Sequence, residues 1–381
     1  MAYAGTLVLQ FALAFTQGGR FAAVSRRSML STPAVLAMAP SPAAAGSEMA
    51  GKRFSHSLAS VEVSGVSIPV AIWRPAAATA AATVLPPATY PYKIDIGKIA
   101  AKLRVGWLTW LPKFDFDLPC GAAAAEALPG FSRARDGDAI MFAHGFLGSV
   151  YDFAHAAEAL ASDGFTVVAP ELPESLSASY LPPEGLDRAT IIRATRELVA
   201  GSETRWGIFG HSAGAGSALL QPETYSLGRA CFAGGAARFD GYTSSIDQPV
   251  FVCSSNGDGC NQFMQLPDPD LRNVLAADGD TVLFESLATA YPTPARPPAR
   301  GAFVFAADNS AAPLPCHISF LWSEVNDAMI SLLSSLLPLA KALGLFLLDF
   351  DVYRETRDAE ATAALLVPAL RRFFLSSSSA T

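Results

Sequence analysis

Charged residues are scarce in this chain of 381 residues. They make up 16% of the sequence, against about 25% in ordinary soluble proteins, whereas apolar residues make up 51% and the mean hydropathy is +0.30. This much apolar surface can form a core, which excludes disorder over most of the chain. The 27 Lys and Arg residues are outnumbered by 34 Asp and Glu residues, and the net charge of −7 argues against a nucleic-acid partner.

Cysteine is also rare. The five cysteines are too few and too scattered for a disulfide scaffold, and none of them has the C-x-x-C spacing of a structural zinc site. No internal repeat is visible in the sequence. Nothing in the sequence therefore implies a metal or an organic cofactor.

Acidic residues are absent before Glu48. Leu7–Phe15 is an apolar run of signal-peptide length, and Ala12-Leu13-Ala14 supplies the small-x-small pattern of a cleavage site. We predict a signal peptide over 1–14 and, from its acid-poor composition, a transit-peptide-like segment over 15–47. This arrangement resembles the two-part plastid-targeting sequence of algae whose plastids are surrounded by additional membranes. An ordinary secretory signal with a linker is the alternative.

From about residue 54 onward, short apolar runs alternate with helical stretches. This alternation is typical of an α/β protein whose central sheet is mostly parallel and has helices on both faces, and we predict one such domain over 54–376. The Ala- and Pro-rich stretch 76–130 is predicted to be an irregular insertion, ordered only over Ile94–Leu111. The predicted strands lie in 61–73 (a pair with a turn at Gly65), 138–143, 165–169, 205–209, 231–234, 250–253 and 302–306, and the predicted helices in 153–160 and 188–200.

The longest apolar stretch is 328–348, which carries one charge, Lys341. Its length would allow it to span a bilayer, but Pro338 and Gly344 divide it into two shorter helices. Two other interpretations remain. The stretch can form a cap that covers a binding pocket and contacts a membrane surface, or it can form ordinary buried helices. We predict a helical cap over 328–348.

The sequence Gly210-His211-Ser212-Ala213-Gly214 lies between a predicted strand and a predicted helix. Small residues on both sides of a serine allow a tight strand-to-helix turn that presents its hydroxyl oxygen at the carboxyl edge of a sheet. We therefore predict that Ser212 is a nucleophile and that the N–H of Ala213 binds a developing oxyanion. A glycine-rich turn without catalytic function is the alternative.

A second oxyanion donor is expected in the loop after the strand 138–143, which reads His144-Gly145-Phe146-Leu147-Gly148. The N–H of Phe146 is the natural donor, because the preceding glycine allows close approach of the backbone. We expect His144 to brace this loop. Leu147 and His211, next to the two donors, are expected to line the substrate pocket.

The base follows by elimination. In an α/β-hydrolase triad the serine is followed along the chain by the acid and then by the histidine, and His317 is the only one of five histidines after Ser212. Asp258 comes shortly after an apolar strand and is the favoured acid, with Asp240 as its competitor. Cys260 and Cys316 lie close to Asp258 and His317, so a disulfide between the two loops is a further hypothesis for an oxidising compartment.

With these residues in view, the chain resembles an α/β-hydrolase of the chlorophyllase family, which is related to platelet-activating-factor acetylhydrolases and cutinase-like esterases. The resemblance rests on three segments: Ile140–Leu172, Gly210-His211-Ser212 and Phe303–Asp308, which precedes the histidine. It covers about 138–376. The chain departs from the family after the nucleophile, where Ala replaces Arg, and in the region of its acid, 235–241.

The resemblance implies hydrolysis of the phytyl ester of chlorophyll to chlorophyllide and phytol. It also implies a plastid location and is compatible with peripheral contact with the thylakoid membrane. A general carboxylesterase or lipase that acts on acyl lipids is the alternative, and a non-catalytic protein that binds pigment or lipid is a third interpretation. In each case the expected partner is a small apolar molecule.

Overall fold

The computed structural model describes part of the chain: residues 54–76, 89–102, 109–121, 128–177, 180–199, 201, 203–233, 248–255, 257–258, 281–283, 300–305, 313–331 and 359–379. The chain divides into two compact units, Met1–Met49 and Ala50–Thr381, and all of the described residues belong to the second. The predicted signal peptide (1–14) and transit-peptide-like segment (15–47) lie outside the described residues.

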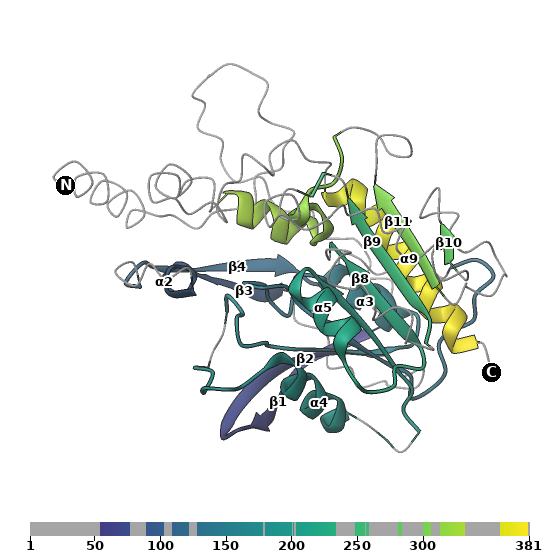
Figure 1. The fold of residues 1–381 in the computed structure, drawn as a ribbon, viewed down its shortest axis with the longest axis horizontal. Coiled ribbons are helices and arrows are strands. Elements are labelled where there is room, and N and C mark those ends of the chain that lie inside the picture. Colours follow the sequence, from purple (N-terminus) through teal and green to yellow (C-terminus); the bar gives the residue numbers. More distant parts are fainter. Residues whose placement is uncertain are drawn as a thin grey trace, which may run out of the picture. The chain divides into compact units, whose positions relative to one another are not determined.

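A nine-stranded sheet forms the centre of the second unit (Figure 1). Its strand order is β1-β2-β6-β5-β7-β8-β9-β11-β10. Strand β2 is antiparallel to β1 and to β6, and the remaining pairs are parallel. The strands are β1 (Phe54–Val63), β2 (Val66–Pro75), β5 (Ala139–Ala143), β6 (Thr166–Pro170), β7 (Trp206–His211), β8 (Gly228–Phe232), β9 (Val250–Ser255), β10 (Thr281–Leu283) and β11 (Arg300–Phe305).

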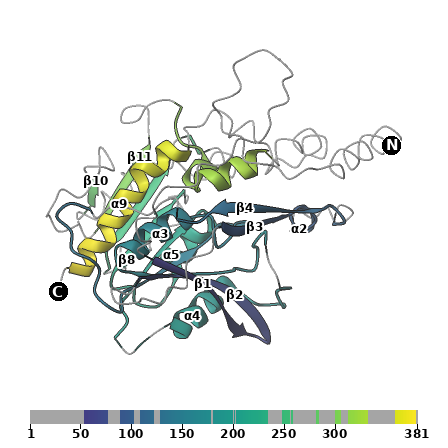
Figure 2. The same ribbon diagram turned by 180° about the vertical axis from the view of Figure 1, so that it is seen from behind.

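Helices cover both faces of this sheet. Helices α4 (Arg188–Val199) and α5 (Ala213–Leu220) pack on one face, and α3 (Ala154–Ser162) and α9 (Ala359–Ser379) pack on the other, as Figures 1 and 2 show from opposite sides. A helix over 323–331 follows the short 3-10 helix η5 (His317–Phe320). The predicted fold class, a mostly parallel sheet with helices on both faces, is confirmed.

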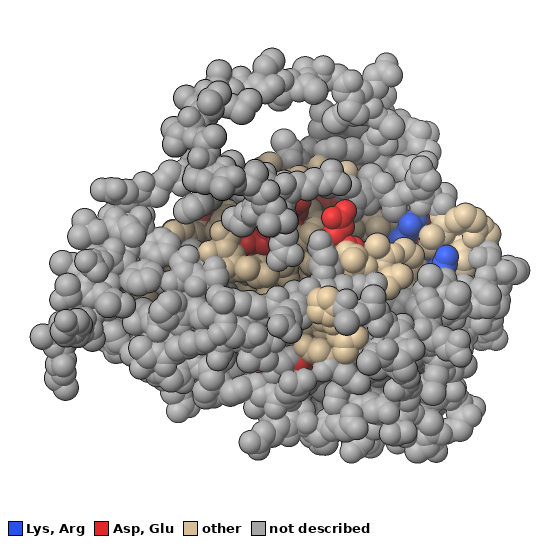
Figure 3. Space-filling view, turned by 90° about the horizontal axis from the view of Figure 1, so that it is seen from above, with Lys and Arg blue, Asp and Glu red and all other residues tan. Residues whose placement is uncertain are grey.

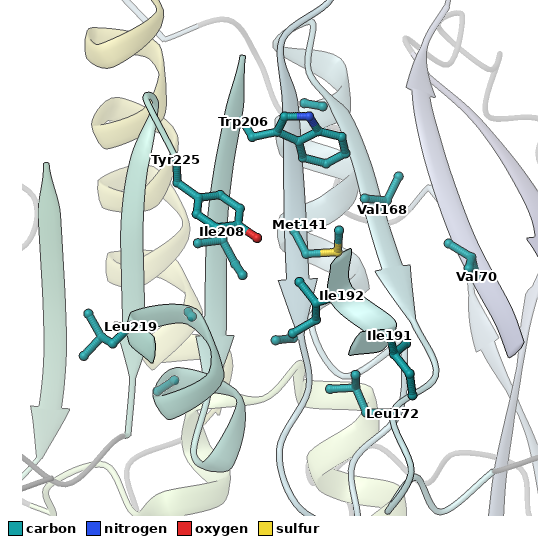
Figure 4. Close-up of a cluster of buried hydrophobic side chains, with 14 of the residues drawn as sticks. Val70, Met141, Val168, Leu172, Ile191, Ile192, Trp206, Ile208, Leu219 and Tyr225 are labelled. Atoms are coloured by element: carbon teal, nitrogen blue, oxygen red, sulfur yellow. The ribbon is translucent and has the colours of Figure 1, made fainter. Parts of the chain in front are cut away.

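The sequence explains why the central strands are covered on both faces. Strands β5, β7 and β9 are buried at every position, as expected for parallel strands that lie between two layers of helices. Figure 4 shows side chains of three neighbouring strands, Val168, Met141 and Ile208, gathered against Ile191 and Ile192 of α4. The edge strand β1 instead buries only Phe54, His56 and Val63, and its other side chains are half-buried or exposed.

The prediction of an irregular insertion over 76–130 is wrong for 89–93 and 113–119, which are strands, whereas the helix over 96–102 lies in the part that was predicted to be ordered. Strands β3 (Thr89–Asp95) and β4 (Lys113–Pro119) form a separate two-stranded antiparallel sheet, and α2 (Ile96–Lys102) follows β3. The alternation of large apolar side chains in β3 is the signal that was missed: Tyr90, Tyr92 and Ile94 are all fully buried. We call β3, α2 and β4 the insertion.

The described residues on one face of the molecule carry few charges (Figure 3). Seen from above, they are mostly uncharged, with acidic side chains near the middle of the view and basic side chains towards one side (Figure 3). Among the described helices, none is both long and apolar enough to cross a membrane. The predicted cap over 328–348 lies outside the described residues except for 328–331, which are helical.

Helix α9 is joined to the rest of the domain by a buried ion pair. Arg371 donates from Nε and Nη2 to the two carboxylate oxygens of Asp163, at 2.7 Å each, and both side chains are buried. Asp163 directly follows α3, so the pair links α9 to the helix that it packs against on this face. Removing one partner of such a pair leaves an uncompensated buried charge.

We therefore expect Arg371→Met to lower the free energy of unfolding by about 3–5 kcal/mol, measured by urea denaturation. The matched control is Arg193→Met, which removes an exposed pair with Glu223 and should cost less than about 1 kcal/mol. Restoring charge balance with Arg371→Met/Asp163→Asn should recover part of the loss. Equal costs at the two arginines would contradict this assignment.

Candidate active site

Ser212 occupies a strained turn between β7 and α5. Its backbone has φ +56° and ψ −120°, a left-handed conformation that is unfavourable for a residue with a side chain. The flanking glycines are required by close packing: a β-carbon at Gly210 would overlap the carbonyl of Gly214, and one at Gly214 would overlap the carbonyl of Ala143. The turn lies at the end of a central strand, where it presents the serine hydroxyl at the edge of the sheet.

The structure brings Ser212, His317 and Asp258 into one hydrogen-bonded chain. Nε2 of His317 lies 2.8 Å from the Ser212 hydroxyl oxygen, and Nδ1 lies 2.9 Å from Oδ2 of Asp258. Because a carboxylate accepts, Nδ1 carries the hydrogen and Nε2 has the lone pair that faces the serine. The alternative acid, Asp240, lies outside the described residues.

The loop that carries Asp258 fits tightly against the loop that precedes His317. The N–H of Asp258 donates to the carbonyl of Ser255 at 3.1 Å, and Asp258 is almost completely buried. A β-carbon at Gly257 would come within 2.7 Å of the side chain of Leu314, so this position leaves no room for a larger residue. The two loops are thus held together by packing.

The proposed disulfide between Cys260 and Cys316 is not formed. Cys316 is a free, buried thiol whose sulfur lies 3.3 Å from the hydroxyl of Ser319, and burial raises the pKa of the thiol. Cys260 lies outside the described residues. The hypothesis failed because proximity in sequence to the acid and the base does not set the direction of a cysteine side chain, which here points into η5.

The two predicted oxyanion donors are Ala213, which directly follows Ser212, and Phe146, which follows a glycine that packs against Ser212. Ala213 is the first residue of α5, where a backbone N–H has no partner within the helix. Gly145 packs against the serine, since a β-carbon there would lie 3.3 Å from Cβ of Ser212. Phe146 comes next, with an exposed ring, and Leu147 follows with φ +56° and a half-buried side chain.

His144 fixes this loop through hydrogen bonds of both of its ring nitrogens. Its Nε2 accepts the N–H of Leu172 at 2.9 Å, so the ring hydrogen lies on Nδ1, which donates to the carbonyl of Gly145 at 2.8 Å. Burial lowers the pKa of His144 to about 3, and the ring is therefore neutral. Arg188 of α4 donates to the carbonyl of His144 at 2.8 Å, which connects the loop to α4.

His211 does not line an open pocket. The side chain is almost completely buried, and its Nε2 lies 2.9 Å from the main-chain carbonyl oxygen of His317. Burial, followed by the charge of His317, lowers the pKa of His211 well below its ordinary value. The prediction for Leu147 stays a prediction, because the structure shows only that its side chain is half-buried.

Sequence reasoning missed Asp152, a buried carboxyl group that binds the residue after the loop His144–Gly148, which we call the oxyanion loop after its predicted role. Its Oδ2 accepts the N–H of Ser149 at 3.0 Å and its Oδ1 accepts the hydroxyl of Tyr92 at 3.2 Å. Its carbonyl accepts the N–H of Trp322, in the segment after η5. The spacing Ser149-x-x-Asp152 is typical of a capping box and was a usable signal, whereas the partner Tyr92 was not predictable.

Burial raises the pKa of Asp152 from 3.8 to about 7, against the opposing effect of its hydrogen bonds with Ser149 and Tyr92. Glu158 of α3 is a second fully buried carboxyl group, which accepts the hydroxyl of Tyr90 at 2.8 Å and the N–H of Gly121 at 2.7 Å. The insertion is thus attached to the domain at two carboxyl groups. One of them also contacts the oxyanion loop. In the part of the chain that is described, no three His, Cys, Asp or Glu side chains could hold a metal ion together.

The strand order, the antiparallel β2 and the strained serine between β7 and α5 decide the fold. The chain has the α/β-hydrolase fold. No model of a known protein family matches the chain, and no curated protein sequence matches it.

Several solved structures are similar. The acylaminoacyl peptidase of Pyrococcus horikoshii is 14% identical, with a TM-score of 0.38 over 70% of this chain and 38% of the peptidase, so the chain spans well under half of the peptidase. An α/β serine hydrolase without a lid from Xanthomonas campestris is 14% identical, with a TM-score of 0.38 over 73% of this chain and 93% of that one. Brefeldin A esterase, a bacterial homologue of human hormone-sensitive lipase, is 11% identical, with a TM-score of 0.39 over 88% of this chain and 80% of the esterase. These similarities do not point to chlorophyllases in particular.

The buried Asp152 predicts a dependence of stability on pH. The unfolded chain ionises this group near pH 3.8 and the folded chain near 7, so the folded state binds more protons in between. The contribution of Asp152 to the free energy of unfolding therefore falls as pH rises through this window. Asp152→Asn keeps a donor and an acceptor without the charge, so it should raise the Tm relative to the wild type at pH 8 and not at pH 4.

The control is Asp187→Asn, at an exposed carboxylate whose pKa is lowered by its hydrogen bond with the N–H of Thr190. This group stabilises the folded state above pH 3.8, so its loss should act in the opposite direction at neutral pH. Thermal unfolding at pH 4, 6 and 8 measures both variants. A shift for Asp152→Asn that is the same at every pH would contradict a buried neutral carboxyl group.

Proposed function

We propose that this protein is a serine hydrolase that cleaves carboxylic esters through an acyl-enzyme. The observation that carries the proposal is the chain of two hydrogen bonds from Ser212 through His317 to Asp258, at 2.8 and 2.9 Å. A serine hydroxyl is a weak nucleophile unless an adjacent base takes its proton, and the base in turn needs a group that fixes its orientation. In the proposed mechanism Ser212 is the nucleophile, His317 is the base and Asp258 fixes the orientation of the base.

In the first step the hydroxyl oxygen of Ser212 attacks the carbonyl carbon of the ester while its proton moves to Nε2 of His317. The negative charge that develops on the carbonyl oxygen is stabilised by the N–H groups of Ala213 and Phe146. Asp258 stabilises the imidazolium and stays ionised. The tetrahedral intermediate then expels the alcohol, which takes the proton from His317 and leaves an acyl group on Ser212.

In the second step a water molecule attacks the acyl-enzyme. His317 takes a proton from this water, the same N–H groups stabilise the second oxyanion, and the proton then passes to the oxygen of Ser212 as the carboxylic acid leaves. The enzyme returns to its starting state. No group beyond the residues named and one water molecule is required.

An apolar ester is the substrate class that the described surface favours. The exposed ring of Phe146 follows Gly145, which packs against the serine, and the half-buried Leu147 comes next. Apolar side chains beside a reacting centre gain free energy when an apolar substrate group covers them. The proposed substrate therefore has a hydrocarbon or aromatic portion next to its carbonyl group.

The finer proposal is the phytyl ester of chlorophyll, and its support is the resemblance of Ile140–Leu172 to chlorophyllases. A plastid location and peripheral contact with the thylakoid membrane belong to this finer proposal, with secretion as the alternative. The location is tested by sequencing the N-terminus of the protein isolated from its own cells and by fractionating plastids. A mature N-terminus in a protein recovered only from the medium would exclude the plastid.

Replacing the nucleophile should abolish turnover. Ser212→Ala is expected to lower kcat on a p-nitrophenyl ester by on the order of 10⁶-fold and to prevent labelling by an alkyl fluorophosphonate. Asp258→Asn should keep the fold and lower kcat by roughly 10⁴-fold, because the imidazole loses its orientation and its counter-charge. Asp240→Asn is the matched control and should retain turnover.

The opposite result for the two aspartates would assign the acid to Asp240. Wild-type protein that is folded but is neither labelled nor active on any ester would favour a non-catalytic protein that binds pigment or lipid.

A parallel assay on chlorophyll, p-nitrophenyl esters of increasing acyl length and a triacylglycerol emulsion separates the substrate classes. We expect kcat/KM on p-nitrophenyl esters to rise from acetate to longer acyl chains, because each buried methylene group contributes about 0.8 kcal/mol. Release of chlorophyllide would support the finer proposal. Turnover of short esters with chlorophyll left intact would reject it and leave a general carboxylesterase.

A further inference from the structure

His211 is the last residue of β7 and directly precedes Ser212. Its ring is enclosed by other rings: the centroid of His317 lies 4.8 Å away, that of Phe153 lies 5.9 Å away and that of Phe320 lies 6.5 Å away. The side chain is only 4% exposed. A polar ring held in such a position needs a partner for its N–H, and this partner is informative.

The partner is the backbone of the proposed base. Nε2 of His211 lies 2.9 Å from the carbonyl oxygen of His317, and a carbonyl oxygen can only accept. Nε2 therefore carries the hydrogen. In the neutral ring Nδ1 is then unprotonated, and it faces the oxyanion loop, because a β-carbon at Gly145 would lie 3.2 Å from it. One buried ring thus spans from the oxyanion loop to the main chain of His317.

The residues on both sides of His317 in the chain are fixed by other hydrogen bonds. Asn326 donates to the carbonyl of Ile318 at 2.8 Å, and the hydroxyl of Ser319 accepts the N–H of Cys316 at 3.1 Å. Neither bond reaches His317 itself. The carbonyl oxygen of His317 belongs to the first turn of η5, where a 3-10 helix bonds it to the N–H three residues on. The bond from His211 adds a side-chain donor from the end of β7, which fixes this carbonyl relative to the serine turn.

We propose that His211 is a positioning residue for His317: its Nε2–H fixes the His317 carbonyl and thereby holds the imidazole between Ser212 and Asp258. The inference rests on the proposed function, since it assigns His317 the role of base. It replaces the expectation that His211 lines the substrate pocket. A positioning residue of this kind acts on the rate of the chemical step, because a displacement of the base by about 1 Å can cost on the order of 100-fold in rate.

Three variants test this role. His211→Phe keeps a ring of similar size and removes the donor, and it should lower kcat on a p-nitrophenyl ester by about 10–100-fold with little change in KM. His211→Gln places an amide N–H at a similar reach and should restore most of kcat. Phe153→Leu is the matched control: it loosens the same ring cluster without touching a hydrogen bond, so it should lower the Tm and leave kcat near that of the wild type.

Labelling by a fluorophosphonate gives a second readout, because its rate depends on activation of Ser212 by His317. It should fall with kcat in His211→Phe and recover in His211→Gln. A raised KM with unchanged kcat would return His211 to the substrate pocket and overturn the proposal. Equal losses of kcat in His211→Phe and His211→Gln, at retained Tm, would also overturn it, because the donor would then be irrelevant.

If His211→Phe does not fold, the comparison is between His211→Gln and His211→Asn, whose shorter amide does not reach the carbonyl of His317. Equal kcat in these two would overturn the proposal. Failure of the proposed function itself is recognised separately, because the wild type would then show no labelling and no ester turnover.

Discussion

The left-handed backbone at Ser212 is the constraint on which the rest of the structure depends. A residue with a side chain adopts such a conformation only where its surroundings impose it. Here the surroundings are the middle of a nine-stranded sheet, where β7 is bonded to β5 on one side and β8 on the other. The packing of Gly210 against Gly214, and of Gly214 against Ala143, leaves the chain no other path. The rigidity of the sheet is therefore what maintains the serine in its position.

Around this serine, three side chains hold the structure by hydrogen bonds to main-chain carbonyl groups. His144 and Arg188 hold the carbonyls of the oxyanion loop, and His211 holds the carbonyl of His317. Two of these three side chains are imidazoles whose pKa values are lowered by burial, so they bond as neutral rings. Neutral rings add no charge close to the positions where charge would develop in the proposed ester cleavage.

The buried carboxyl groups connect the insertion to this site. Tyr90 and Tyr92 leave the same face of β3 and reach Glu158 and Asp152 on the segment after the oxyanion loop. Asp152 in turn holds the N–H of Ser149, within that segment. The insertion is thus joined through Tyr92 and Asp152 to Ser149, which directly follows the loop His144–Gly148.

Most of the fold and the serine turn were accessible from the sequence, because both depend on local patterns. Apolar runs locate parallel strands, and two small residues around Ser212 locate the turn. His317 followed from its place in the chain. The choice between Asp258 and Asp240 stayed open in the sequence, since either position follows a strand. The hydrogen bond of His211 with the carbonyl of His317 could not be predicted because it depends on the path of η5, and the partner of Asp152 was missed because Tyr92 precedes it by 60 residues.

The distances along the chain within the triad have a consequence for folding. Ser212 and His317 are 105 residues apart, and Asp258 and His317 are 59 residues apart. Contacts of such separation form late, because the entropy of closing long loops must be overcome before they are gained. The chain of hydrogen bonds from Ser212 through His317 to Asp258 therefore forms only when β9, which leads to Asp258, and the segment that carries His317 have both packed in place. This chain of hydrogen bonds is thus complete only in the fully folded protein, and a partly folded form with a native β5–β7 core would lack it.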